Sequence, residues 1–282
     1  MGDYQETLQE GYGQRFTVDR ILYEAHTEYQ QFVIFMNARM GRVLALNGVI
    51  QTTEADEFIY HEVLTHVPLF AHGLARRVLI IGGADGGTLR EVAKHREVES
   101  ITMVEADGVL VDICREFLPE HSKGAFGDPR LNLVIDEVMG FFAKTQNKFD
   151  VIIFDVIDPA GQVPEDFYQA CRLCLNDGGI LVARSSTPFL QLNELQTAAK
   201  QMDGLFPDWH FYQAAVPTHM GGTMTFAWGA CSSESRKLPL DTLCQRFAGS
   251  GIVTRCYNPH VHLAAFALPQ YVLQAIGKPS NF

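Results

Sequence analysis

The sequence predicts an α/β fold, in which a parallel, doubly wound sheet follows a small antiparallel β domain. Short runs in the first sixty residues alternate apolar and polar side chains, continuous apolar runs follow, and helical stretches separate those runs. The runs expected to form the core sheet are 78–81, 100–104, 131–135, 151–154, 179–183 and 223–230. The chain has 282 residues, enough for one main core and a small appendage, so we expect domains at residues 1–59 and 60–282.

Local patterns place the elements in order. Strands are expected at 16–22 and 31–36, where the alternation is regular. A helix is expected at 60–70, and the apolar run 77–81 after it is typical of a buried parallel strand. Strands that alternate with helices in this way are typical of a Rossmann-like, methyltransferase-type domain. In such a domain, ligands bind beyond the carboxyl ends of the strands.

Composition restricts the classes of function. The formal net charge of −11 disfavours binding to nucleic-acid phosphates. No apolar segment approaches the roughly 20 residues that span a bilayer, and the first ten residues lack the features of a secretory signal. We therefore expect a cytoplasmic protein without membrane contact. Cys171 and Cys174 lie in an amphipathic stretch without a second Cys/His pair, so no metal site is expected.

A glycine-rich loop, Gly-Gly-Ala-Asp-Gly-Gly at residues 82–87, follows the first core strand. Its glycines permit a tight turn and close approach of a ligand. The loop is not a regular G-x-G-x-x-G, and Asp85 would repel a pyrophosphate on the next helix. It is therefore either an ordinary strand-to-helix turn or the cradle of a ligand that is uncharged or cationic.

Carboxylates follow the next two core strands. Glu105 lies about 20 residues past the glycines, where an acidic side chain can accept both hydroxyls of a ribose, and this favours an adenosyl ligand. Asp136 and Glu137 follow the third strand. They either receive the adenine amino group or cap a helix, with Asp136 at the N-cap and Glu137 in the first turn.

Two aspartates, Asp155 and Asp158, follow the fourth core strand and are the strongest catalytic candidates. An amine is protonated and inert at neutral pH, so an enzyme that uses it as a nucleophile needs a carboxylate to orient the ammonium and accept its proton. Asp155 suits that role. The alternative is a capped turn that ends at Pro159.

Several longer motifs resemble those of one family, the spermidine synthases or polyamine aminopropyltransferases. They are Gly-Tyr-Gly-Gln at 11–14, the stretch 46–62, the loop 82–87, Asp-Val-Ile-Asp-Pro at 155–159, and segments 212–218 and 264–271. The resemblance implies a β domain joined to a Rossmann-like domain, in homodimers or homotetramers. It also implies aminopropyl transfer from decarboxylated S-adenosylmethionine, a co-substrate, to putrescine or a related amine. The other product is 5′-methylthioadenosine, and no tightly bound cofactor is expected.

The resemblance also implies roles for individual residues. Nucleoside contacts fall on Gln30, Gly82, Gly83, Glu105, Asp136 and Glu137. Asp85 would hold the terminal amine of the donor, and Asp155 would be the base. The acceptor would be positioned by His61 and Asp158, and His219, where the family has tyrosine, is a further substrate-site candidate. His219 is either a base or merely hydrogen-bonded.

The sequence departs from the family around the reacting centre. The departures are Ala84, Glu137, Val156, Ile157, Arg184, His219 and a shortened segment after Pro159. Most concern the amine half of the cleft, so the acceptor is left open, and a cation at Arg184 would oppose a diamine.

Two other functions remain compatible with the sequence. A methyltransferase that uses intact S-adenosylmethionine would share the loop, the acidic residue and the fold, although Asp85 would repel its donor's carboxylate unless Arg184 compensates. A catalytically idle relative would bind polyamine or nucleoside only. Retention of both Asp155 and Asp158 favours an enzyme.

Overall fold

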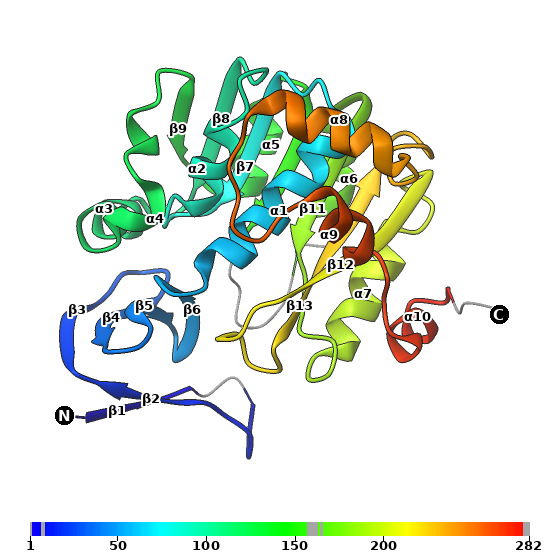
Figure 1. The fold of residues 1–282 in the computed structure, drawn as a ribbon. Helices are drawn as coiled ribbons and strands as arrows, with labels where there is room; N and C mark the ends of the chain where they lie inside the picture. The colour runs from blue at the N-terminus through cyan, green and yellow to red at the C-terminus, as the bar shows by residue number, and fades with distance from the viewer. Residues whose placement is uncertain (1, 7–8, 157–162, 164–165, 279–282) are drawn as a thin grey trace.

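The computed structural model describes residues 2–6, 9–156, 163 and 166–278 (Figure 1). Its centre is a seven-stranded sheet with the strand order β12-β13-β11-β10-β7-β8-β9. These strands are β7 (Arg77–Gly82), β8 (Ser100–Glu105), β9 (Leu131–Ile135), β10 (Phe149–Asp155), β11 (Leu175–Arg184), β12 (Asp208–Ala215) and β13 (Thr223–Ala230). The six predicted strands are all present, and β12 is an additional strand that the sequence pattern did not reveal.

The sheet is mixed rather than parallel throughout, which corrects the prediction. Strands β7 to β11 pair in parallel, whereas β13 is antiparallel to both β11 and β12. The reason lies in the connection between β12 and β13. It is short and turns through Gly221 and Gly222, both at positive φ, and a short connection can join only antiparallel neighbours.

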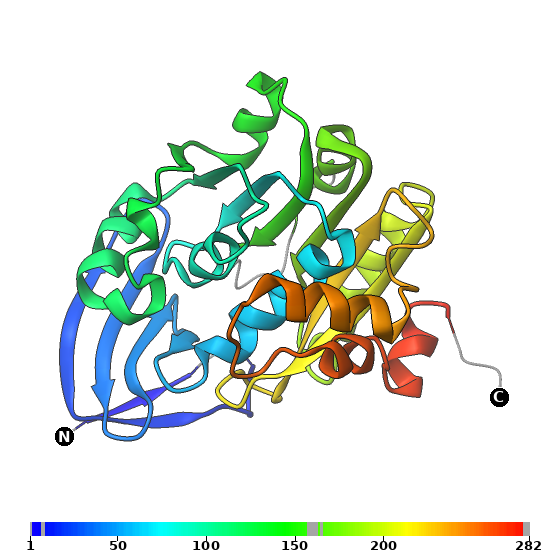
Figure 2. The same cartoon turned by 45° about the horizontal axis from the view of Figure 1, so that its top comes forward.

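The apolar runs of the central strands are continuous because both faces of the sheet are buried. In β7, Val78 and Ile80 pack into one core cluster, whereas Leu79 and Ile81 pack into the other. Residues of β10 and β11 divide in the same way. Successive side chains of a strand point to opposite faces, so helices must cover both sides (Figure 2).

Helices form a layer on each face. The first layer includes α1 (Glu57–His72), α8 (Leu240–Ser250) and α9 (Pro259–Ala265), and the second includes α6 (Phe167–Cys174), α7 (Leu192–Met202) and α10 (Gln270–Ala275). The remaining helices are α2 (Gly87–Ala93), α3 (Gly108–Phe117), α4 (Pro119–Ser122), a short 3₁₀ turn (Ala125–Gly127) and α5 (Val138–Lys144). The described part of the chain contains no helix of the length and apolarity that crossing a membrane requires.

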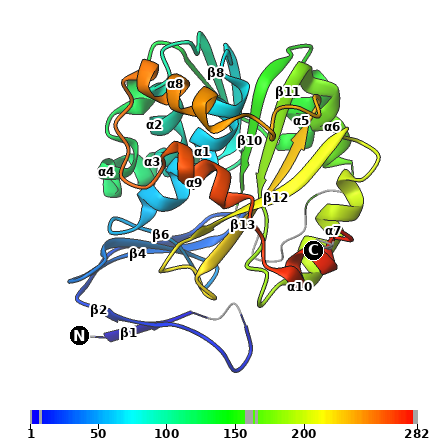
Figure 3. The same ribbon diagram turned by 45° about the vertical axis from the view of Figure 1, so that its right-hand side comes forward.

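The N-terminal strands form a separate antiparallel sheet beneath the core, as predicted (Figure 3). It consists of β3 (Arg20–His26), β4 (Gln31–Asn37), β5 (Gly41–Leu46) and β6 (Val49–Thr53), with β1 (Gly2–Gln5) and β2 (Arg15–Val18) as a two-stranded ribbon. Leu44 and Leu46 pack with Ala84 and Leu110 of the core domain. The small sheet therefore lies against the loops that follow the core strands. The domain limits 1–59 and 60–282 stay a prediction; α1 begins at Glu57.

Candidate active site

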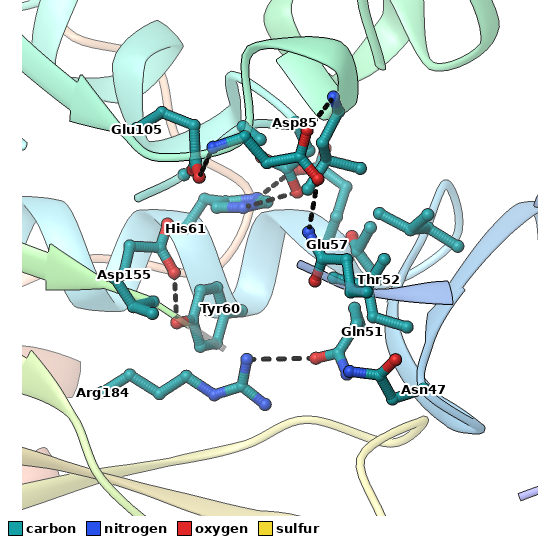
Figure 4. Close-up of a pocket in the computed structure, with 18 of the residues that line it drawn as sticks. Asn47, Gln51, Thr52, Glu57, Tyr60, His61, Asp85, Glu105, Asp155 and Arg184 are labelled. Carbon is teal, nitrogen blue, oxygen red and sulfur yellow. Dashed lines mark hydrogen bonds and ion pairs between the residues drawn. The ribbon is translucent and has the colours of Figure 1, made fainter. Parts of the chain in front are cut away.

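A cavity of about 260 Å³ lies between the carboxyl edge of the core sheet and the N-terminal sheet (Figure 4). Four adjacent strands each place a charged side chain in its wall. Glu105 ends β8, Asp85 follows β7, Asp155 ends β10 and Arg184 ends β11. Because the strands occur in the order β8, β7, β10, β11, these groups form a row along the cavity, with strands about 4.8 Å apart.

Asp155 lies in the middle of this row and is 4% exposed. The hydroxyl of Tyr60 donates to its Oδ1 at 2.6 Å, and the hydroxyl of Thr88 donates to its Oδ2 at 2.6 Å. Burial raises the pKa of Asp155, and the negative charge of Asp85 raises it further, although His61 and the two hydroxyls act in the opposite direction. The carboxylate is thus held in one orientation and takes up a proton more readily than an ordinary aspartate does.

His61 joins Asp85 to a buried cluster of charges. Its Nδ1 lies 2.7 Å from Oε2 of Glu57, and its Nε2 lies 3.3 Å from Oδ2 of Asp85. Burial alone would lower the pKa of His61, but the two carboxylates raise it well above the ordinary value. Arg90 donates from Nη2 to the same Oε2 of Glu57 at 2.8 Å and from Nη1 to its Oε1 at 3.2 Å. His61 and Arg90 together lower the pKa of Glu57 to about 2, against the effect of burial. His61 is therefore an imidazolium between two carboxylates.

The glycines of the loop are required mainly by packing. A Cβ on Gly82, which has a φ of +79°, would lie 2.5 Å from the carbonyl oxygen of Asp155. A Cβ on Gly87 would lie 2.3 Å from the ring of His61. Gly83 and Ala84 line the cavity, whereas Gly82 does not. The loop therefore brings Asp85 and Asp155 close together, and only part of it is open to a ligand.

The end of the cavity at β8 carries the predicted nucleoside contacts Glu105 and Gln30. Burial raises the pKa of Glu105 to about 7, although its Oε1 accepts the N–H of Asp107 at 3.1 Å. The amide Nε2 of Gln30 donates to Oδ2 of Asp107 at 3.2 Å. Asp107 also caps α3 by accepting the N–H of Leu110 at 3.1 Å. It thereby links β8, α3 and the N-terminal sheet, a role that the sequence did not indicate.

Asp136 and Glu137 are not among the residues that line the cavity, and their predicted contact with adenine stays a prediction. Asp136 pairs with Lys144 at 2.6 Å and accepts the N–H of Glu137, while Glu137 is exposed at the N-cap of α5 without a side-chain cap bond. The helix after β9, α5, begins at Val138, directly after these two residues. The predicted N-cap role of Asp136 is also not observed. Asp158 lies outside the described residues.

The end at β11 carries Arg184, Gln51 and His219. Nη1 of Arg184 donates to Oε1 of Gln51 at 3.2 Å, and the ring of His219 stacks on that of Tyr60 with centroids 5.6 Å apart. Burial lowers the pKa of His219 to about 3, and Arg184 contributes. His219 is consequently neutral and a weak base, which favours the interpretation that it is merely hydrogen-bonded.

Several residues of the site were not predicted. Tyr60 and Thr88 hold Asp155, Glu57 holds His61, and Arg90 in turn holds Glu57. Glu57 would have had a signal only if the predicted helix, 60–70, had been extended to the observed start at residue 57, because side chains four residues apart on a helix meet. The other contacts join residues that are distant in the sequence.

The fold and the cavity define a class, a Rossmann-like α/β protein with a row of carboxylates at the carboxyl edge of its sheet. Residues 57–237 match the model of the spermine/spermidine synthase domain, and residues 3–54 match that of the spermidine synthase tetramerisation domain. Polyamine aminopropyltransferase 1 of Pseudomonas aeruginosa is 68% identical, and the polyamine aminopropyltransferase of Pseudomonas syringae pv. tomato is 67% identical. Each match covers 100% of both chains.

Solved structures agree with these matches. A crystal structure of spermidine synthase from Thermotoga maritima superposes with a TM-score of 0.91 at 35% identity, over 98% of this chain and 94% of the other. A complex of spermidine synthase with the transition-state analogue AdoDATO matches equally well. The chain therefore belongs to the spermine/spermidine synthase family. The predicted family, the Rossmann-like class and the predicted enzyme class, an aminopropyltransferase, are confirmed.

Proposed function

We propose that the protein transfers the aminopropyl group of decarboxylated S-adenosylmethionine to a primary amine, putrescine or a related compound, and releases 5′-methylthioadenosine. The observation that carries this proposal is the row of charged groups at the sheet edge. Asp155, with its raised pKa, lies between the strand of Asp85 and that of Arg184, with Glu105 beyond Asp85. A donor that contacts Glu105 at the end of β8 and Asp85 after β7 would place its reactive carbon near Asp155.

The donor is held at two points in this proposal. Glu105 accepts the ribose hydroxyls, and Asp85 receives the terminal ammonium beside His61. Intact S-adenosylmethionine would place a carboxylate near Asp85. Arg184 lies two strands from Asp85, beyond Asp155, and its guanidinium donates to Gln51, so it is not directed by any observed contact toward Asp85. The charges thus support the decarboxylated donor over a methyltransferase reaction.

Transfer proceeds as a displacement in line with the leaving sulfur. Asp155 takes a proton from the acceptor ammonium, and the free amine attacks the carbon next to the sulfonium. Tyr60 and Thr88 fix the carboxylate, so that the contribution of the protein is mainly alignment and electrostatic stabilisation. A neutral thioether leaves, so no strong acid is required.

Assembly and location are part of the proposal. The match of residues 3–54 to a tetramerisation domain supports an oligomer, a homodimer or homotetramer. Light scattering coupled to gel filtration distinguishes these states. A cytoplasmic location remains a prediction.

The test is an assay of the purified protein with decarboxylated or intact S-adenosylmethionine and a panel of amines, with products identified by mass spectrometry. We expect methylthioadenosine and an aminopropylated amine from the decarboxylated donor only. Asp155→Asn should lose turnover but still bind methylthioadenosine, whereas Asp112→Asn, with an 81% exposed side chain, should retain turnover. Absence of methylthioadenosine with every amine, despite nucleoside binding, would refute the proposal.

A further inference from the structure

The turn between β3 and β4, residues 27–30, reaches the nucleoside end of the cavity. Tyr29 and Gln30 line the cavity together with Glu105. The turn belongs to the N-terminal sheet, whereas Glu105 ends a strand of the core sheet. Packing contributes little to the position of the turn, because Glu28 is exposed and Tyr29 is 48% exposed. Hydrogen bonds must therefore fix it.

The hydroxyl of Thr27 organises the turn from within. Its Oγ1 accepts the N–H of Tyr29 at 3.2 Å and that of Gln30 at 3.3 Å. The backbone N–H of Thr27 donates to the carbonyl oxygen of Gln30 at 2.9 Å. A threonine hydroxyl that accepts the N–H groups two and three residues further on stabilises a compact turn. The backbone of Gln30 is thereby held against Thr27.

Asp107 fastens this turn to the core domain. Its Oδ2 accepts the hydroxyl of Thr27 at 2.8 Å and the side-chain Nε2 of Gln30 at 3.2 Å. Its Oδ1 accepts the N–H of Leu110 at 3.1 Å, and its own N–H donates to Oε1 of Glu105 at 3.1 Å. Asp107 is 3% exposed, so water competes little for these bonds. One residue thus places both nucleoside-binding side chains relative to each other.

We infer that Thr27 and Asp107 are positioning residues for the nucleoside of the donor: they hold Gln30 of the N-terminal domain against the core domain, so that it binds the nucleoside together with Glu105. This inference rests on the proposed aminopropyl transfer and specifies how its donor site is assembled. A glutamine side chain that is fixed before the ligand arrives loses less conformational entropy on binding.

The test removes the hydroxyl of Thr27 and then restores it. Thr27→Val deletes the hydroxyl and keeps the branched shape, whereas Thr27→Ser keeps the hydroxyl. We expect the Kd of methylthioadenosine in calorimetry to rise about tenfold in Thr27→Val and to stay within about twofold in Thr27→Ser. The KM of decarboxylated S-adenosylmethionine should rise with the Kd, and the KM of the amine should stay unchanged. A general disturbance of the fold would raise both KM values.

Asp107→Asn provides a second variant that keeps the start of α3 intact. The amide oxygen of the asparagine can still accept the N–H of Leu110, which leaves the amide nitrogen to face Nε2 of Gln30, donor against donor. The loss of affinity should match that of Thr27→Val. Binding is measured at about pH 8.5, above the pKa of Glu105 of about 7, so that the carboxylate of Glu105 is ionised in both proteins.

Thr145→Val is the matched control. The hydroxyl of Thr145 also accepts a backbone N–H in a turn, that of Asn147 at 3.2 Å, but this turn follows α5 and does not line the cavity. The Kd of methylthioadenosine should be unchanged in this variant.

A double-variant cycle assigns the effect to Gln30. Gln30→Ala should weaken the binding of methylthioadenosine, and adding Thr27→Val to it should cause no further loss, because the hydroxyl acts through Gln30. Additive losses, or normal binding by Thr27→Val, would overturn the inference and leave the proposed function intact. Absence of methylthioadenosine binding by the unmodified protein would overturn both.

Discussion

Replacing Tyr60 by phenylalanine tests how Asp155 is tuned. The substitution removes the hydroxyl that donates to Oδ1 of Asp155 at 2.6 Å but keeps the ring that stacks on His219. A hydrogen bond to a charged group contributes about 1.5–3 kcal/mol. Because the bond favours the ionised carboxylate, its loss raises the pKa of Asp155 further, and one pKa unit corresponds to about 1.36 kcal/mol.

The expected result is a shift of the acid limb of the pH profile. A base is active when it is deprotonated, so kcat/KM falls as the pH drops below its pKa. In Tyr60→Phe this fall should begin about one to two pH units higher than in the unmodified protein. The measurement is kcat/KM for methylthioadenosine release between about pH 5.5 and 9.5.

Tyr212→Phe is the matched control. Tyr212 is fully buried, and its hydroxyl donates to the backbone oxygen of Leu64 at 3.2 Å, so its removal leaves Asp155 unchanged. An acid limb that coincides in both variants would refute the assignment of Asp155 as the base tuned by Tyr60.

Two further predictions concern binding and stability. Glu105 has a pKa raised to about 7 and should bind the ribose hydroxyls when it is ionised, so methylthioadenosine should bind about tenfold more tightly at pH 8 than at pH 6, as measured by calorimetry. The Glu105→Gln variant should lose this pH dependence. Equal affinities of the unmodified protein at the two pH values would contradict the prediction. Gly87→Ala should lower the thermal midpoint of unfolding, because the added Cβ would clash with the imidazole ring of His61. The control Gly249→Ala, in an open position of helix α8, should raise the free energy of unfolding by about 0.4–1 kcal/mol. A rise of the midpoint in both variants would exclude the clash.

Local sequence determined most of the fold. The runs in β7, β10 and β11 predicted buried parallel strands because strands covered on both faces need apolar side chains at every position. The placement of Asp155 and Asp85 at one edge followed from the rule that parallel strands end together. The missed strand β12 mixes His210 and Gln213 with aromatic residues, and this pattern gave no clear period.

The carboxylates at the ends of the core strands could be expected from the chain, but the order of the strands and the pKa of each carboxylate could not. Tyr60 and Asp155 are 95 residues apart, and Arg184 and Gln51 are 133 apart, so only the folded chain brings them into hydrogen-bond contact. Burial and neighbouring charges set each pKa, and both depend on packing around the cavity. The sequence alone therefore determined the family, the sheet edge and the acids along it. The tertiary structure decided which of these acids are held by hydrogen bonds and which other side chains, such as those of Tyr60 and Arg184, share their cavity.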